Sequence, residues 1–353
     1  MAYTNINKSS LHMNTKLYTG NASAGHAITG VGFQPDWVWI KDRGSNANHH
    51  LFDAVRGVTK DIISNSSNAQ GTDAQKLTAF GADGFTVGTN GNVNGSSANM
   101  VSWNWKAGTG QGSSNTDGSI NTTYTSANTT SGFSISQYTA TGNNATVGHG
   151  LGVAPKMILF KNLNRTSSNA QSWGVYHQAL GNTKFLQLDT TGAQNQTSPT
   201  SLFFNDTSPT SSVFSIGTNN RVNADAGDTY IAYCFAEKTG YSKFGSYIGN
   251  GNADGTFVYT GFKPAFVICK ITNTTDDWYI FNNKMPGYNL INESLRANTS
   301  DAQNSTGQID FTSNGFKTRT SNYAVNGGSQ SYIYMAFAEA PLVGTNNVPC
   351  TAR

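Results

Sequence analysis

A ten-residue pattern that occurs three times constrains the fold of this chain more than any other feature. Each copy is Gly, an apolar residue, any residue, Pro, any residue, four apolar residues and then Lys. The three copies span residues 32–41, 152–161 and 261–270. Proline fixes φ and has no N–H, so Pro35, Pro155 and Pro264 indicate strand entrances. The apolar run predicts a strand covered on both faces, and the final Lys predicts a return to solvent.

The spacing of these prolines predicts three copies of one domain. They are roughly 110 to 120 residues apart, which suits a domain and is too long for a solenoid or propeller repeat. We predict an N-terminal arm (1–16), three units (17–112, 113–240 and 241–341) and a C-terminal tail (342–353). The Gly-, Ser-, Asn- and Thr-rich stretch 107–131 is expected to be a linker between the first two units. The unpatterned termini are expected to lie outside the cores and to anchor the protein to its neighbours.

Aromatic residues also recur at equivalent places in the three units. Each unit ends on an aromatic-rich strand, in which Trp105, Phe235 and Phe337 occupy matching positions. Another apolar strand begins with Trp173 in unit two and Trp278 in unit three. Both alternating faces of these strands are largely apolar, so both tryptophans are expected in cores.

Composition favours β structure throughout. Charged residues make up 12% of the chain, against an average near 25%, and Glu occurs only at positions 237, 293 and 339. With many glycines and aromatics and few helix formers, we predict an all-β chain of three tandem antiparallel β-sandwich repeats, lectin-like or jelly-roll-like. A barrel is the alternative.

Charge and cysteine usage exclude several classes of protein. The formal net charge is +3 with scattered Lys and Arg, which is no footprint for nucleic acid. No apolar run approaches the length that spans a membrane, and no secretory signal is visible, so synthesis in a cytoplasm is expected. Cys234 and Cys269 lie in strand patterns and are expected to be buried thiols, while Cys350 lies in the tail.

No constellation of catalytic or metal-binding residues emerges, so we predict no enzyme activity, no metal and no cofactor. Glu237 and Glu339 are equivalent residues of two units, which indicates a structural role. The adjacent Asp276 and Asp277 are expected in a solvated loop, and His49-His50 in a strand rather than on a metal. Ligand-binding residues stay unassigned, although Trp and Tyr faces beside Asn and Asp suit sugars.

The three-unit pattern resembles a family of repeated domains of unknown function in virion proteins of tailed, often marine, phages. The resemblance rests on four stretches and covers most of the chain. These are residues 32–41, 148–157, 230–237 and 348–353. It implies a virion structural protein, often labelled tail fibre, with a lectin-like sandwich, and it supplies no catalytic residues.

We therefore expect a non-enzymatic structural protein on the exterior of a tailed-phage virion, made in the host cytoplasm. As a tail-fibre or host-attachment component it would bind a host cell-surface glycan. A capsid-surface decoration or knob is one alternative, because no shaft repeat or heptad is visible, and a carbohydrate-active enzyme is another. Expected partners are other virion proteins and further copies of the same chain, without nucleic acid or membrane insertion.

Overall fold

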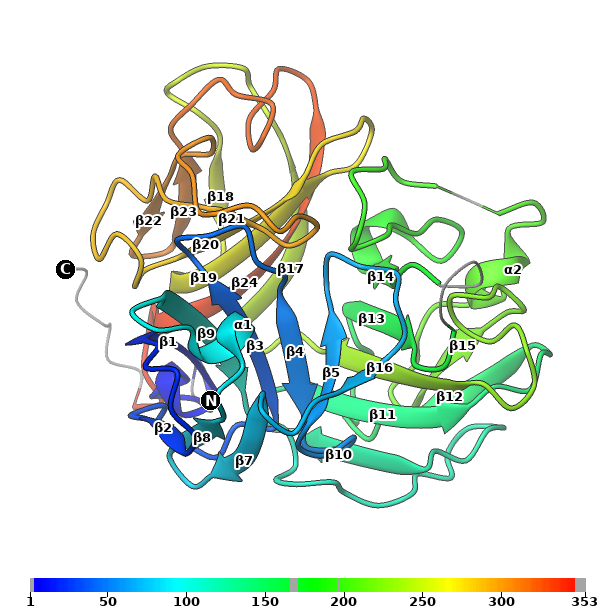
Figure 1. Ribbon diagram of the computed structural model, residues 1–353. Helices are drawn as coiled ribbons and strands as arrows, with labels where there is room; N and C mark the ends of the chain where they lie inside the picture. The colour runs from blue at the N-terminus through cyan, green and yellow to red at the C-terminus, as the bar shows by residue number, and fades with distance from the viewer. Residues whose placement is uncertain (1–2, 166–170, 196, 347–353) are drawn as a thin grey trace.

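The structure, a computed structural model, describes residues 3–165, 171–195 and 197–346 (Figure 1). The described chain is nearly all β, as predicted, and its sheets are antiparallel. Its helices are single turns: η1 (Ser9–Leu11), α1 (Gly91–Asn94), η3 (Gln178–Leu180) and α2 (Ser201–Phe204). Few good helix formers are present, so aromatic and β-branched residues set the local preference.

Three large sheets form the body of the molecule, one each in segment one (residues 13–105), segment two (124–235) and segment three (242–341). In Figure 1 the three segments lie around a common centre. Segment one is blue to cyan, segment two is green, and segment three is yellow to red. The sheet of segment one has the order β1 (Met13–Thr19), β9 (Asn99–Trp105), β3 (Trp37–Asp42), β4 (His50–Asp53), β5 (Lys60–Ile63), β6 (Gly71–Thr72). That of segment two has β10 (Tyr124–Asn128), β11 (Phe133–Thr139), β16 (Thr229–Phe235), β13 (Met157–Asn162), β14 (Gly174–His177). That of segment three has β17 (Ser242–Ile248), β24 (Ser331–Pro341), β19 (Phe262–Ile271), β20 (Trp278–Asn282), β21 (Leu295–Arg296).

The large sheets share both strand order and register. In each, the opening strand (β1, β11 or β17) pairs with the closing strand (β9, β16 or β24), which pairs with the proline-led strand; segment two has an additional edge strand, β10, beside β11. Trp105 lies opposite Met13 and Trp37, Phe235 opposite Phe133 and Met157, and Phe337 opposite Ser242 and Phe266. Pro35 and Pro155 stand just before β3 and β13, whereas Pro264 lies within β19 at a bulge, an irregularity of the ladder that tolerates a residue without an N–H.

A smaller sheet covers the outer face of each large sheet. The small sheets are β2 (His26–Thr29), β8 (Gly84–Val87) and β7 (Leu77–Gly81); β12 (Ala145–Gly148) and β15 (Val213–Ile216); β18 (Phe257–Tyr259), β23 (Gly315–Thr318) and β22 (Ile309–Thr312). Each encloses an apolar cluster with its own large sheet, for example Phe85 with Val38 and Phe214 with Phe160. Every sheet has two edge strands, so the alternative of a barrel is wrong.

The inner faces of all three large sheets meet in one central core. The proline-led strands are apolar on both faces because one face packs on the small sheet and the other on this core. Trp37 of segment one stacks on Tyr233 of segment two at 4.7 Å between ring centroids. Phe337 of segment three lies 5.9 Å from Trp105 and 6.1 Å from Phe235. The three segments therefore share apolar surface that none buries alone.

The lysine that ends each proline-led strand is buried, so the expected return to solvent is wrong. Lys41, Lys161 and Lys270 are each 0% exposed. Lys161 Nζ donates to the carbonyls of Ser67 in segment one and Gln171, at 2.9 and 2.8 Å. Burial lowers the pKa of all three to about 8. The ammonium groups thus satisfy loop carbonyls inside the molecule.

Lys161→Met is expected to lower, by about one, the number of protons that the chain takes up when it unfolds at alkaline pH. Burial depresses the folded pKa to about 8 from 10.5, so between these values the unfolded chain binds more protons. Stability then rises with pH through this window, by at most about 1.4 kcal/mol per pH unit for one group. Urea unfolding from pH 7.5 to 9.5 measures the slope.

The exposed Lys8 supplies the control, and Lys8→Met should keep the wild-type slope. Burial raises the thiol pKa of Cys234 and Cys269, which opposes the rise at higher pH equally in all three proteins. Only differences between the proteins are therefore compared. Equal slopes in Lys161→Met and wild type would show that Lys161 is not desolvated.

Neither the expected arm nor the expected linker is free of the fold. Strand β1 begins at Met13, and Ile6 is 3% exposed within the central core. In the stretch 107–131, β10 pairs with β11, and Ile120 is buried. The buried Asp36 accepts the backbone N–H groups of residues 107, 109 and 110. At the other end, Thr345 bonds Asn7; residues 347–353, with Cys350, lie outside the described range.

Candidate functional site

The predicted core tryptophans tie one segment to the next. Trp173 and Trp278 are 0% and 1% exposed in the central core. Trp173 Nε1 donates to the Ile63 carbonyl of segment one, and Trp278 Nε1 donates to the Gln187 carbonyl of segment two, both at 2.9 Å. The matching position of segment one holds the buried His49, and Ser64 Oγ of segment one donates to the Ala297 carbonyl of segment three at 2.6 Å. These contacts close a ring through all three segments.

Three buried asparagines, which the sequence analysis missed, hold the opening turn of each segment. Asn94, Asn223 and Asn326 are each 0% exposed. Their Oδ1 atoms accept the backbone N–H groups of residues 21, 141 and 250 at 2.8 to 3.0 Å. Each follows a valine, whose carbonyl accepts the hydroxyl of the opening-strand tyrosine at 2.7 Å. The recurring Val-Asn pair at 93–94, 222–223 and 325–326 was the available signal.

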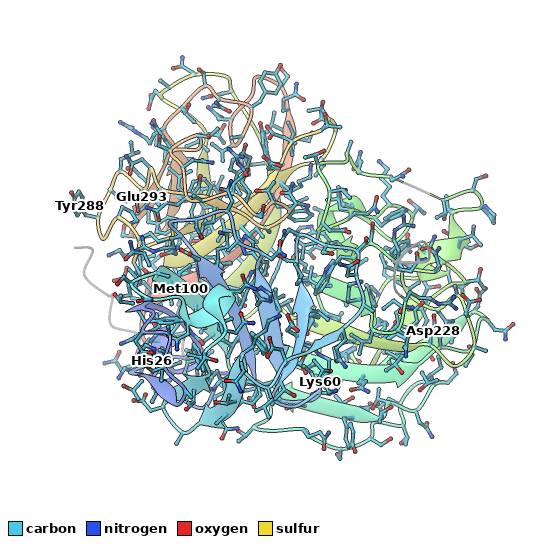
Figure 2. The ribbon with its side chains drawn as sticks, viewed as in Figure 1. His26, Lys60, Met100, Asp228, Tyr288 and Glu293 are labelled. Carbon is cyan, nitrogen blue, oxygen red and sulfur yellow. The ribbon has the colours of Figure 1, made fainter. Side chains whose placement is uncertain are left out.

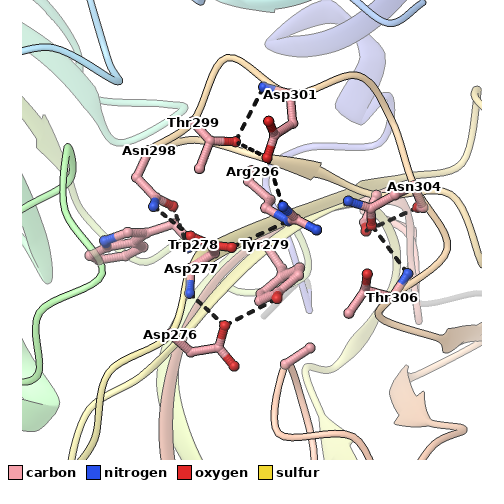
Figure 3. A network of polar contacts seen from close by, with 12 residues as sticks. Asp276, Asp277, Trp278, Tyr279, Arg296, Asn298, Thr299, Asp301, Asn304 and Thr306 are labelled. Carbon is pink, nitrogen blue, oxygen red and sulfur yellow. Dashed lines mark hydrogen bonds and ion pairs between the residues drawn. The ribbon is translucent and has the colours of Figure 1, made fainter. Parts of the chain in front are cut away.

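The adjacent carboxylates Asp276 and Asp277 lie in the expected loop, between β19 and β20, but they are half-buried there and belong to a polar network of segment three (Figure 3). Asp276 Oδ1 accepts the Tyr279 hydroxyl at 3.1 Å, and Asp277 Oδ1 accepts the Asn298 amide at 2.7 Å. Arg296 bridges Asp277 at 3.3 Å and Asp301 at 2.7 Å. The Arg296 guanidinium binds both the Asp277 and the Asp301 carboxylate. Neither carboxylate is therefore free to act as a general acid or base in this arrangement.

His50 and Asp61 form a second buried polar pair, in segment one. His50 Nδ1 and Lys76 Nζ each lie 2.7 Å from Asp61 Oδ2. Burial lowers the pKa of His50, and the hydrogen bond to Asp61 opposes this shift. Against the effect of burial, the hydrogen bonds of His50 and Lys76 lower the pKa of Asp61 to about 2. With Lys76 the pair forms a polar cluster in segment one; His50 begins strand β4, and His49 lies just before it.

The equivalent glutamates lie apart, each beside a surface lysine. Glu237 Oε1 is 3.7 Å from Lys243 Nζ, and Glu339 Oε2 is 3.1 Å from Lys263 Nζ. Within residues 3–165, 171–195 and 197–346, no three His, Cys, Asp or Glu side chains gather as metal ligands would. The same residues contain no helix with the length and apolarity to cross a membrane.

A groove in segment three is the arrangement best suited to a ligand. We call it the Tyr288 groove: a hollow of about 380 Å³ lined by Lys263, Asn283, Lys284, Tyr288, Asn289 and Glu339, among others. Tyr288 is 78% exposed and projects at the margin of the molecule near Glu293 (Figure 2). The groove thus offers one aromatic face beside amide, ammonium and carboxylate groups.

Hydrogen bonds fix the groove wall. The Asn289 amide donates to the Phe311 carbonyl at 2.8 Å, and its Oδ1 accepts the Phe311 N–H at 2.9 Å. Asn282 Oδ1 accepts the backbone N–H groups of Lys284 and Met285 at 3.0 Å. The loop that carries Tyr288 is therefore anchored to strands β22 and β20 on either side. The ring is presented by an ordered wall.

A family model described as a domain of unknown function (DUF7483) matches residues 8–341. No curated protein and no solved structure matches the chain.

Proposed function

The chain belongs to this family, DUF7483, and we propose that it is a non-enzymatic structural protein on the exterior of a tailed-phage virion. In this proposal it is a tail-fibre or host-attachment component that binds a host-surface glycan. The observation that carries the binding role is the exposed Tyr288 ring over a polar groove. Aromatic faces stack on the apolar faces of sugar rings, while amide and charged groups bond the hydroxyls.

We further propose that the chain consists of three tandem antiparallel β-sandwich repeats. Support comes from the strand order and register that the three large sheets share, and from the small sheet on each. The three buried asparagines and the three tyrosine-to-carbonyl hydrogen bonds recur at matching positions. We place the repeats at 17–112, 113–240 and 241–341, with the first extended to Met13, where β1 begins.

Against the alternative of a carbohydrate-active enzyme, Asp277 and Asp301 are both bound to Arg296, and the two equivalent glutamates are bound to lysines. A second placement, as a capsid-surface decoration, is favoured by the single central core that joins all three segments. Such a body suits a knob better than an extended shaft. Labelled antibody on intact particles in the electron microscope separates the two placements, and absence of label from particles would refute both.

Tyr288→Ala is expected to weaken glycan binding by about two- to tenfold, because loss of an aromatic face costs roughly 0.5–1.5 kcal/mol. A glycan array followed by titration of the glycans bound by the wild type measures the change. The melting temperature should not move, since Tyr288 is exposed. Tyr323→Ala removes another exposed tyrosine, 56% accessible and outside the groove, and should bind as the wild type does. Equal binding by Tyr288→Ala and wild type would contradict the assigned site.

A further inference from the structure

The Tyr288 groove does not end within segment three. Two further hollows, of about 50 and 340 Å³, continue it toward segment one. Lys284 lines all three hollows, Asn283 and Glu339 are common to the first two, and Asn14 and Thr15 to the last two. The path therefore runs from Tyr288 past Lys284 onto strand β1 and reaches Lys16 and Gly30. A ligand that uses both ends must be a chain, because the two ends lie on different segments.

Charge along this path is net positive: Lys263, Lys284 and Lys16 line it, against Glu339 and the Asp83 carboxylate that interacts electrostatically with Lys16. Lys263 is compensated by Glu339 at 3.1 Å. Lys284 and Lys16 form no ion pair with any carboxylate of the residues that the structure describes. Lys284, the exposed residue shared by all three hollows, is thus an uncompensated cation at their junction. This arrangement favours anionic groups on the ligand.

One buried acceptor on the path lacks a donor. Asn283 Oδ1 is shielded and has no hydrogen-bond partner within the described part of the chain. The Asn283 backbone is held in place, because its N–H donates to the Ala265 carbonyl at 2.9 Å. A shielded acceptor without a donor is costly, so a rotation of the half-buried Asn283 side chain that brings Oδ1 to a ligand hydroxyl is favoured. A fully ionised inorganic polyanion carries no such hydrogen.

We propose that this extended groove takes an acidic polysaccharide, a chain of linked sugars that bears both hydroxyl donors and carboxylates. Tyr288 stacks on one sugar ring, Asn283 Oδ1 accepts a sugar hydroxyl, and Lys284 and Lys16 bind carboxylates of successive sugars. The inference rests on the proposed glycan-binding role and deepens it, because it names the substrate class and extends the site to segment one.

The test is calorimetric titration of the full chain with matched pairs of oligosaccharides. Short oligomers of galacturonate, of alginate and of hyaluronan are each compared with their methyl esters, which keep the sugar and linkage but remove the charge. We expect the wild type to bind at least one acidic oligomer about tenfold or more tightly than its ester, the effect of a charge-assisted hydrogen bond. Polyphosphate should compete poorly.

The variants assign the effect to residues. Lys284→Gln and Lys16→Gln should each weaken binding of the acidic oligomer while leaving the ester unchanged, whereas Tyr288→Ala should weaken both. Lys243→Gln, a surface lysine outside the path, is the control.

Three outcomes would overturn the inference: no acidic oligomer binds, the ester binds equally, or polyphosphate competes equally well. The proposed function fails separately, when the wild type binds no glycan on the array or Tyr288→Ala binds every glycan as the wild type does.

Discussion

Replacing Trp105 by alanine is expected to destabilise the whole chain by about 3–5 kcal/mol, the range for a large aromatic removed from a core. The Trp105 ring is 0% exposed and lies 4.5 Å from Trp37, 5.5 Å from Phe266 and 5.9 Å from Phe337. Because two of these neighbours belong to segment three, the cavity opens between segments rather than within one.

The informative part of this prediction is its cooperativity. Urea unfolding followed by tryptophan fluorescence and by circular dichroism should give one coincident transition for the wild type, and the same for Trp105→Ala at lower urea. Tyr288→Ala, which alters an exposed aromatic, should leave the midpoint unchanged. Separate transitions, with only one of them shifted by Trp105→Ala, would mean that the segments are independent domains despite their shared core.

Replacing Asp53 by alanine is expected to cost about 3–5 kcal/mol, because it leaves a buried guanidinium without its counter-ion. Asp53 is 0% exposed, and its Oδ2 lies 2.5 Å from Arg56 Nε. The same oxygen accepts the hydroxyl of Tyr233 in segment two at 2.7 Å. The Asp53 carboxylate therefore bonds one side chain of its own segment, Arg56, and one of segment two, Tyr233.

Two variants separate these contributions in the same urea measurement. Tyr233→Phe removes only the bond between segments and should cost about 1 kcal/mol. Glu237→Gln breaks a partly exposed pair with Lys243 and should cost less than about 1 kcal/mol. If Asp53→Ala were no worse than Glu237→Gln, the Asp53–Arg56 pair would have to be accessible to water, contrary to its burial.

Strand content and much of the packing could be predicted from local patterns. The four apolar residues after Pro35, Pro155 and Pro264 lack polar alternation, which indicates strands covered on both faces, and all three strands are so covered. Trp173 and Trp278 were assigned to cores because their strands are apolar on both faces, and both are buried. These features follow from patterns that extend over only a few residues, so a single sequence is enough to predict them.

The buried lysines and the central core could not be predicted in this way. A Lys after an apolar run is ordinarily exposed; Lys161 is buried because the loop of a different segment supplies the Ser67 carbonyl. Likewise, the arrangement of Trp37 against Tyr233 depends on how sheets far apart in the sequence pack together. The Tyr288 groove has no linear signature either, because its walls come from loops and strands brought together by folding.

By itself, the sequence determined a nearly all-β chain with a threefold recurring pattern, because alternation, proline position and residue preference act over short distances. Only the tertiary structure decided that the segments share one core, that residues 3–16 and the stretch 107–131 pack into the fold, and that a polar groove crosses from segment three to segment one. The shared core depends on contacts between residues far apart in the sequence, such as Trp105 with Phe337. Such contacts are set by side-chain complementarity between surfaces, which no local pattern encodes.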